Sequence, residues 1–219
     1  MKFFLLSVFS TLVITSINAQ VELNIFAGPQ ATTAYYKVKG AKQDTKFKYG
    51  FQAGAGLKVT FEDKLFFAPA VFYSLKGYKV TFTRFAFPPG PEAADNNTSL
   101  HTVELAALLQ YDFSRKPGHF YIKAGPSLDF QLKGKEKFNL ITTGSVERDM
   151  PFSYGDYGHY SANLVTQLGY ETSGGLVVFL QYSHGLGSIN NADGGPSIQH
   201  RVYGLSIGKF LNRKKDNKK

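Results

Sequence analysis

The sequence predicts an eight-stranded antiparallel up-and-down transmembrane β-barrel of the outer-membrane type, following a cleaved signal peptide. Three observations predict this fold class: an apolar leader, long segments in which apolar and polar residues alternate, and connections that are alternately short and long. At 43% hydrophobic and 19% charged residues, the chain is too apolar for a disordered protein. It contains no cysteine, which excludes disulfides and thiol chemistry.

The first residues have the three-part form of a secretory signal. Lys2 precedes an apolar run over residues 3–17, and Asn18-Ala19-Gln20 provides a cleavage site after Ala19. The run is too short and too rich in serine and threonine for a membrane-spanning helix, which needs about 20 apolar residues. We therefore expect export. The predicted division is a signal peptide over 1–19, an outer-membrane barrel domain over 20–211 and a basic periplasmic tail over 212–219.

Alternation of apolar and polar residues is clearest over residues 47–61. A strand in a water-soluble sheet averages about 5 to 6 residues, whereas a tilted strand that crosses a bilayer needs about 9 to 11. The length of this segment therefore favours a membrane strand. Other segments follow the same pattern less strictly. The predicted strands are 21–33, 47–61, 65–82, 99–113, 120–132, 160–171, 176–186 and 202–210.

Connections between the predicted strands are tight at one end and long at the other. The tight turns are 62–64, 114–119 and 172–175, and the long loops are 36–46, 83–98, 133–158 and 187–197. Outer-membrane barrels have short periplasmic turns and longer extracellular loops, and an even number of strands lets the sheet close without edges. Pro29, Pro69 and Pro126 fall inside predicted strands, where each lacks the N–H of the ladder, so we expect a bulge or kink at each.

Short Gly-rich and aromatic motifs run through most of the chain after the leader. They are the glycine-rich 51–57 (FQAGAGL), 69–77 (PAVFYSLKG), 120–127 (FYIKAGPS) and 203–210 (YGLSIGKF), together with the signal end at 18–20. With these motifs the sequence resembles the PorT-type outer-membrane β-barrel family. The resemblance implies an eight-stranded barrel in the outer membrane of a Gram-negative bacterium, and some members of that family assist type IX protein secretion. No motif in the sequence assigns that secretion role to a particular residue.

Alternation also sorts the charged residues that point into the barrel into two layers. The layer toward the periplasm contains Lys58, Asp112, Lys123 and Glu171, and the layer toward the outside contains Lys48, Lys76, Glu104 and Asp129. Each layer sums to zero formal charge. Because buried charges of one sign are costly unless they are paired, this balance predicts a plug of ion pairs and argues against an ion pathway. A barrel of this size is just wide enough to be filled by side chains.

Candidate chemical sites are few. Alternation points His159 and His200 inward at the long-loop rim, where a metal site or a His–Asp pair with Asp156 or Asp193 is an alternative to ordinary interface chemistry. Glu104 and Asp129 form a second alternative, as paired catalytic carboxylates, although nearby lysines suffice to explain them. We expect no catalytic residue, no metal and no cofactor.

The favoured function is an integral outer-membrane protein with a structural or interaction role, acting through extracellular loops such as 133–158. One alternative is a barrel enzyme with a site at the outer rim. Another is a soluble lipocalin-like binding protein, whose apolar face would point inward. The net charge of +9 permits contact with lipopolysaccharide or acidic lipid, and export argues against nucleic acid. Expected partners are therefore outer-membrane lipid, lipopolysaccharide and a protein bound by the loops.

Overall fold

The computed structural model describes residues 21–213. The predicted signal peptide and the last part of the predicted basic tail, 214–219, lie outside the described residues. Within the described range, no helix is long and apolar enough to cross a membrane.

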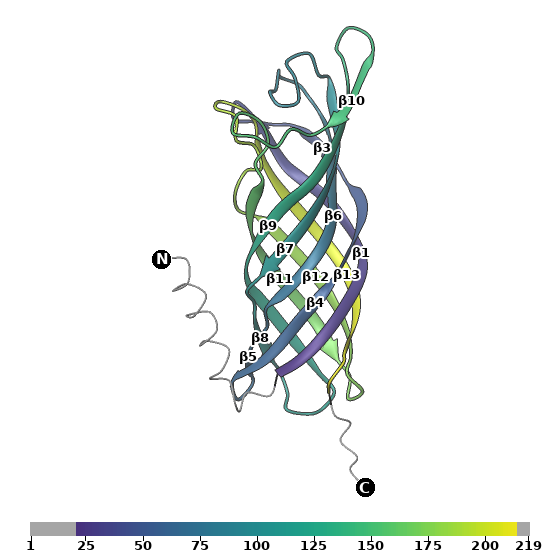
Figure 1. Ribbon diagram of the computed structural model, residues 1–219, viewed down its shortest axis with the longest axis vertical. Coiled ribbons are helices and arrows are strands. Elements are labelled where there is room, and N and C mark those ends of the chain that lie inside the picture. The colour runs from purple at the N-terminus through teal and green to yellow at the C-terminus, as the bar shows by residue number, and fades with distance from the viewer. Residues whose placement is uncertain (1–20, 214–219) are drawn as a thin grey trace, which may run out of the picture.

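A single antiparallel sheet wraps around a long axis to form a tall barrel (Figure 1). Its strands are β1 (Val21–Val38), β2 (Ala41–Lys42), β3 (Asp44–Lys46), β4 (Lys48–Glu62), β5 (Leu65–Phe67), β6 (Ala70–Thr81), β7 (Asp95–Ala106), β8 (Leu109–Asp112), β9 (His119–Asn139), β10 (Ser145–Asp149), β11 (Tyr160–Glu171), β12 (Leu176–Gly185) and β13 (Ser197–Phe210). The sheet closes because β1 pairs with both β4 and β13. Since β5 with β6, and β7 with β8, each make one strand of the wall, the barrel is eight-stranded as predicted.

The two ends of the barrel differ in their connections (Figure 1). At the short-turn end, β1 begins and β13 ends, and only tight turns join neighbouring strands. At the long-loop end, several strands continue beyond the predicted boundaries: β1 reaches Val38, β7 begins at Asp95, β9 reaches Asn139 and β13 begins at Ser197. Much of the predicted loop sequence is therefore sheet. The strands continue beyond the part of the wall that is apolar outside. In that part, apolar and polar residues no longer alternate in the sequence, so alternation could not predict the extra strand residues.

Of the three prolines, Pro69 falls at a break between strands, whereas Pro29 lies within β1 and Pro126 within β9. None of them coincides with a register shift, so the bulges expected there do not form. The breaks between β5 and β6 and between β7 and β8 face each other, with Ala68 N donating to Leu108 O at 2.8 Å. Pro69 stands at the first break, and Pro126 lies opposite the second, where its carbonyl oxygen accepts from Ala107 N. Pairing on both sides of the breaks keeps one register, and β1 passes through Pro29 without a shift. Each proline therefore removes one backbone N–H donor from the strand pairing but does not shift its register.

Register shifts occur elsewhere, and one of them changes which side chains face the lumen. In β9 the pairing with β7 shifts between His101 and Thr102, so that Leu132 is an extra residue. Before this bulge the odd-numbered residues of β9 are buried, and after it the even-numbered ones are, including Glu136 and Phe138. A bulge that re-aims side chains in this way is a local feature of strand pairing.

Apolar side chains cover the outside of the wall, and charged ones lie inside it. Tyr49 is 86% exposed, whereas Asp129 is fully buried. Exposed aromatic side chains gather near the strand ends, as in the interfacial girdles of membrane barrels. Those girdle residues include Tyr49, Phe61, Tyr111, Phe113, Phe120, Tyr160 and Tyr170. A lipocalin has the opposite arrangement, so the lipocalin-like alternative is wrong.

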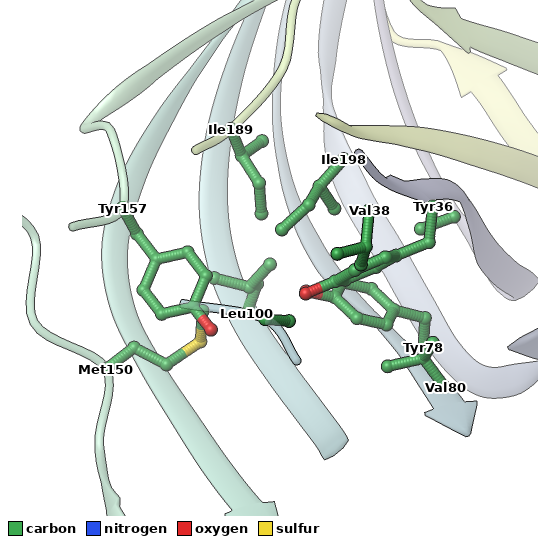
Figure 2. Packing of buried hydrophobic residues seen from close by; sticks show 11 residues of the cluster. Tyr36, Val38, Tyr78, Val80, Leu100, Met150, Tyr157, Ile189 and Ile198 are labelled. Atoms are coloured by element: carbon green, nitrogen blue, oxygen red, sulfur yellow. The ribbon is translucent and has the colours of Figure 1, made fainter. Parts of the chain in front are cut away.

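Two clusters of buried apolar side chains fill the lumen at different heights. The lower cluster, nearer the short-turn end, includes Phe26, Phe72 and Phe179. The upper cluster lies at the long-loop end, where Tyr36, Tyr78 and neighbouring side chains converge from opposite walls (Figure 2). Strand β6 carries Phe72 of the lower cluster and Tyr78 of the upper cluster, with the buried Lys76 between them.

Candidate functional site in the barrel lumen

Buried polar side chains form three clusters along the barrel axis. Strand β9 contributes one inward residue to each: His119 at the short-turn end, Asp129 in the middle and Glu136 at the long-loop end. The lower apolar cluster lies between the first two, and the third adjoins the upper apolar cluster, with which it shares Tyr157. Because the strands run the height of the wall, each cluster draws its members from strands distant in sequence.

At the short-turn end, one lysine bridges two carboxylates. Lys58 Nζ lies 2.6 Å from Asp112 Oδ2 and 3.1 Å from Glu171 Oε2. Gln110 Nε2 donates to both carboxylates, at 2.6 Å and 2.7 Å. His119 Nε2 lies 2.9 Å from Asp112 Oδ2. This histidine was expected in a tight turn, but it is the first residue of β9 and is buried.

Arg213, which follows the last strand, folds back onto this cluster. Its guanidinium contacts Glu171 Oε2 at 2.7 Å and donates two hydrogen bonds to Glu22. Asn212 also bonds to the backbone of β1, through Leu23 N and Val21 O. Burial lowers the pKa of Arg213, but the hydrogen bonds to Glu22 and Glu171 outweigh burial and raise it above its usual value. Residues 212 and 213 of the predicted basic tail are therefore bound to the barrel.

The middle cluster is enclosed on all sides. Lys76 Nζ lies 2.9 Å from Glu104 Oε2 and 2.7 Å from Asp129 Oδ2, and all three side chains are almost completely buried. Ser127 donates to Glu104, and Ser161 donates to Asp129 at 3.3 Å. Hydrogen bonds of this kind to the remaining carboxylate oxygens are what a buried ion pair requires. The pair of carboxylates is therefore held by a lysine and lies away from bulk water.

Two of the predicted lumen lysines make no ion pair in the described part of the chain. Lys48 instead donates to Thr98 O and Ser99 Oγ, both at 2.7 Å. The Lys123 ammonium lies 5.0 Å from the centroid of the Tyr121 ring. Alternation correctly places both side chains on the lumen side, but it does not fix the height at which a side chain meets partners across the barrel. The ion pairs of the lumen therefore centre on Lys58 and Lys76, whereas Lys48 and Lys123 make other contacts.

The third cluster lies at the long-loop end and was not predicted. Glu136 Oε1 accepts from Arg148 Nε at 2.8 Å, and its other oxygen accepts from Tyr157 OH at 2.7 Å and from Asn96 Nδ2 at 3.0 Å. Arg148 also donates to Pro89 O at 2.6 Å. Burial, together with the neighbouring Tyr78 and Glu136, raises the pKa of Tyr157 well above its usual value. This hydroxyl therefore remains a donor to Glu136.

The two rim histidines do not come together. His159 is exposed and stacks on Phe152, with ring centroids 5.4 Å apart. His200 is buried, with its ring centroid 5.8 Å from that of Tyr78. The inward placement predicted for His159 is therefore wrong, while that for His200 agrees with the structure. Sequence reasoning could not detect this difference because residue 159 precedes the first residue of β11.

One set of side chains has donors close enough to hold a metal ion. The ligand atoms of Asp112, His119 and Glu171 lie within 4.8 Å of one another. The same carboxylates already contact Lys58 and Arg213, so a divalent ion would have to displace an ammonium group. The arrangement is better explained as charge pairing within the protein.

A cavity of about 10 Å³ lies among Asn24, Lys123 and Gln167 beside the lower apolar cluster. That volume is at the lower limit for one water molecule. Above it, Gln52 bonds across the barrel to Gln181 at 3.0 Å, which closes the space between opposite walls.

A closed antiparallel wall that is apolar outside and charged inside defines an integral membrane β-barrel. The chain belongs to the family described as the outer membrane protein beta-barrel domain, whose model matches residues 15–191. It is thus an integral protein of the outer membrane.

Solved structures with which this chain can be superposed are distant in sequence. Ail, the attachment invasion locus protein of Yersinia pestis, in complex with the heparin analogue sucrose octasulfate, is 16% identical, covering 87% of this chain and 99% of that chain with a TM-score of 0.45. OprG from Pseudomonas aeruginosa is 13% identical, with 88% and 96% covered and a TM-score of 0.48. Neisserial surface protein A is 12% identical, with 85% and 96% covered and a TM-score of 0.43. No curated protein sequence matches the chain.

Proposed function

We propose that this protein is a non-conducting outer-membrane barrel with a structural or interaction role. The observation that carries the proposal is the filled lumen, which contains three clusters of buried polar side chains and two clusters of buried apolar side chains. Ions and solutes need a continuous aqueous path, which an eight-stranded barrel packed with side chains does not offer. We therefore assign the function of the protein to its outer surface.

The surface for a protein partner is the exposed part of the long loops, which we place outside the cell because short turns are periplasmic in bacterial barrels. Phe138 and Tyr157 of loop 133–158 are buried and serve the fold. Tyr154, in contrast, is 87% exposed, and Ile141 of the same loop and Phe85 of loop 83–98 are exposed as well. Aromatic side chains of this kind are enriched at protein interfaces.

The resemblance to PorT-type barrels supports an accessory role in protein secretion as the finer proposal. We propose no catalytic role. Glu104 and Asp129 are held by Lys76 inside the wall, and His159 is separated from the lumen that contains His200. An enzyme with a site at the outer rim would need such groups to converge where a substrate could reach them.

The proposed closed lumen is tested by inserting the purified protein into planar lipid bilayers, with a general porin as the positive control. We expect no stable conductance steps. A reproducible conductance from the folded protein would overturn the proposal.

The proposed interaction surface is tested by cross-linking, because the chain contains no cysteine and single cysteines report unambiguously. Tyr154→Cys is compared in intact cells with Tyr49→Cys, which is placed in the girdle facing lipid. We expect a discrete protein adduct for Tyr154→Cys alone. Equal labelling at both positions, or no adduct at Tyr154→Cys, would contradict a partner at the loops.

A further inference from the structure

Three cationic side chains surround one tyrosine on the outward face at the long-loop end. Lys37 Nζ lies 4.8 Å from the centroid of the Tyr35 ring, Lys42 Nζ lies 5.8 Å from it, and Arg201 Cζ also lies 5.8 Å from it. The three cations come from β1, β2 and β13, which pair side by side. We call these four residues the Tyr35 cluster.

No carboxylate neutralises the Tyr35 cluster. Among residues 21–213, none of its three cations takes part in an ion pair. Arg201 donates only to uncharged oxygens, such as His200 O at 2.8 Å and Gly185 O at 3.1 Å. Three positive charges therefore stand together, and no carboxylate of the described residues lies within ion-pair distance of them.

Strand pairing makes this arrangement unfavourable on its own. Lys37 pairs directly with Lys42 across β1 and β2, and Lys46 pairs directly with Lys79 across β3 and β6. Like charges in directly opposed cross-strand positions destabilise a sheet. Since the same unfavourable pairing occurs twice on this outward face, an anion from outside the protein would relieve it.

The height of the Tyr35 cluster indicates where that anion is. Arg201 stands two residues from Tyr203 on the outward face of β13, which is about 7 Å along a strand. Tyr203 belongs to the aromatic girdle, with its ring 5.1 Å from Tyr182 and 5.9 Å from Phe47. Aromatic girdles lie at the membrane interface, where lipid headgroups begin. The cations thus stand at the level of headgroup phosphates.

We propose that the Tyr35 cluster binds a phosphate group of lipopolysaccharide in the outer leaflet. Lys37, Lys42 and Arg201 supply the positive charge, and the Tyr35 ring holds the three cations around one point. The site faces sideways from the wall, directly above the lipid-facing girdle, so a lipid anchored in the leaflet reaches it more readily than a soluble acidic partner. The inference rests on the proposed orientation, with the long loops outside the cell.

The test is equilibrium binding of fluorescent lipid A, the phosphorylated anchor of lipopolysaccharide, to the purified full-length mature protein in a zwitterionic detergent. The triple variant Lys37→Gln, Lys42→Gln, Arg201→Gln is compared with Lys64→Gln, Lys116→Gln, Lys209→Gln, which removes three cations at the short-turn end. Heat-dependent gel mobility verifies that each variant is folded. Dephosphorylated lipid A and inorganic phosphate serve as competitors.

We expect the first triple variant to bind lipid A on the order of 10- to 100-fold more weakly than the parent protein, since each basic residue near an anionic surface contributes about one factor of five. The second triple variant should bind as the parent does, and dephosphorylated lipid A should compete poorly. Equal weakening in both triple variants, or equal competition by dephosphorylated lipid A, would overturn the site. Competition by inorganic phosphate at the concentration of lipid A would show a site for free phosphate and overturn the lipid assignment. A negative result here leaves the closed lumen and the loop surface standing, because those are tested by conductance and cross-linking.

Discussion

The guanidinium of Arg213 reaches Glu171 Oε2 at 2.7 Å, although 42 residues separate them and Arg213 lies in the segment predicted to be a basic periplasmic tail. Glu171 ends β11, and Arg213 follows β13 by three residues. Because Glu22 at the start of β1 binds the same guanidinium, this contact joins β1, β11 and the residues that follow β13. The short-turn end is thereby closed by side chains as well as by hydrogen bonds.

Replacing Arg213 should weaken the barrel. Arg213→Gln leaves Glu22 and Glu171 without their guanidinium partner, and we expect a loss of about 1–3 kcal/mol in the free energy of unfolding. Urea unfolding followed by circular dichroism measures this, since the chain has no tryptophan. Lys209→Gln, on the outward face of β13, is the matched control and should change little. An unfolding curve for Arg213→Gln that overlays the parent curve would count against a role for the contact.

The two lysines of the lower lumen should respond in opposite ways. Lys58→Met leaves Asp112 and Glu171 without their shared ammonium, and we expect a loss of about 3 kcal/mol or more. Lys123→Met removes a buried cation that has no ion pair in residues 21–213, so we expect no loss, or a gain of about 1 kcal/mol. Both variants are measured by the same urea titration. A larger loss for Lys123→Met than for Lys58→Met would refute this assignment of partners.

The middle cluster allows a test by charge replacement. Lys76→Met leaves Glu104 and Asp129 facing each other in a buried site, with an expected loss of about 3–5 kcal/mol. Adding Glu104→Gln and Asp129→Asn removes the uncompensated charges, so the triple variant should recover much of that loss. Thermal loss of the folded gel band ranks the three proteins. Failure of the triple variant to recover any stability would show that packing, and not charge, sets the effect.

Glu136 should control the order of the long loops without controlling the barrel. Glu136→Ala frees Arg148 and Tyr157, both of which it binds. Trypsin added to reconstituted protein should then cleave at Arg148 several-fold faster, while the folded barrel band persists. Glu147→Ala, whose contact with Lys137 is exposed and 3.6 Å long, is the control. Unchanged cleavage in Glu136→Ala would mean that other contacts hold the loop.

Neighbouring strands approach so closely at Gly54 that there is no room for a side chain. A Cβ atom on Gly54 would collide with Phe72 and with the backbone of Val71 in the neighbouring strand. Gly54→Val should therefore reduce the yield of folded barrel, as judged by heat-dependent gel mobility. Thr60→Val, near the end of the same strand, should fold normally. A normal yield for Gly54→Val would show that the strands can separate there.

Local sequence determined the fold class and the two faces of the wall. Alternation with a period of two is a property of each strand by itself, so it placed Lys58, Lys76 and Asp129 on the lumen side before any partner was known. Alternating connection lengths set the up-and-down order, and the strand lengths indicated a bilayer. The family match and the closed sheet confirm this part.

Tertiary structure decided which inward charges meet. The height of a side chain in the lumen depends on the stagger between strands that are distant in sequence, so Lys76 meets Asp129 while Lys48 meets only Thr98 and Ser99. The bulge at Leu132 turns Glu136 inward because strand pairing, and not alternation, sets its direction there. Arg213 reaches the lumen only because closure of the barrel brings the end of β13 beside the start of β1. These contacts are consequences of closing the sheet, and no single segment of the sequence predicts them.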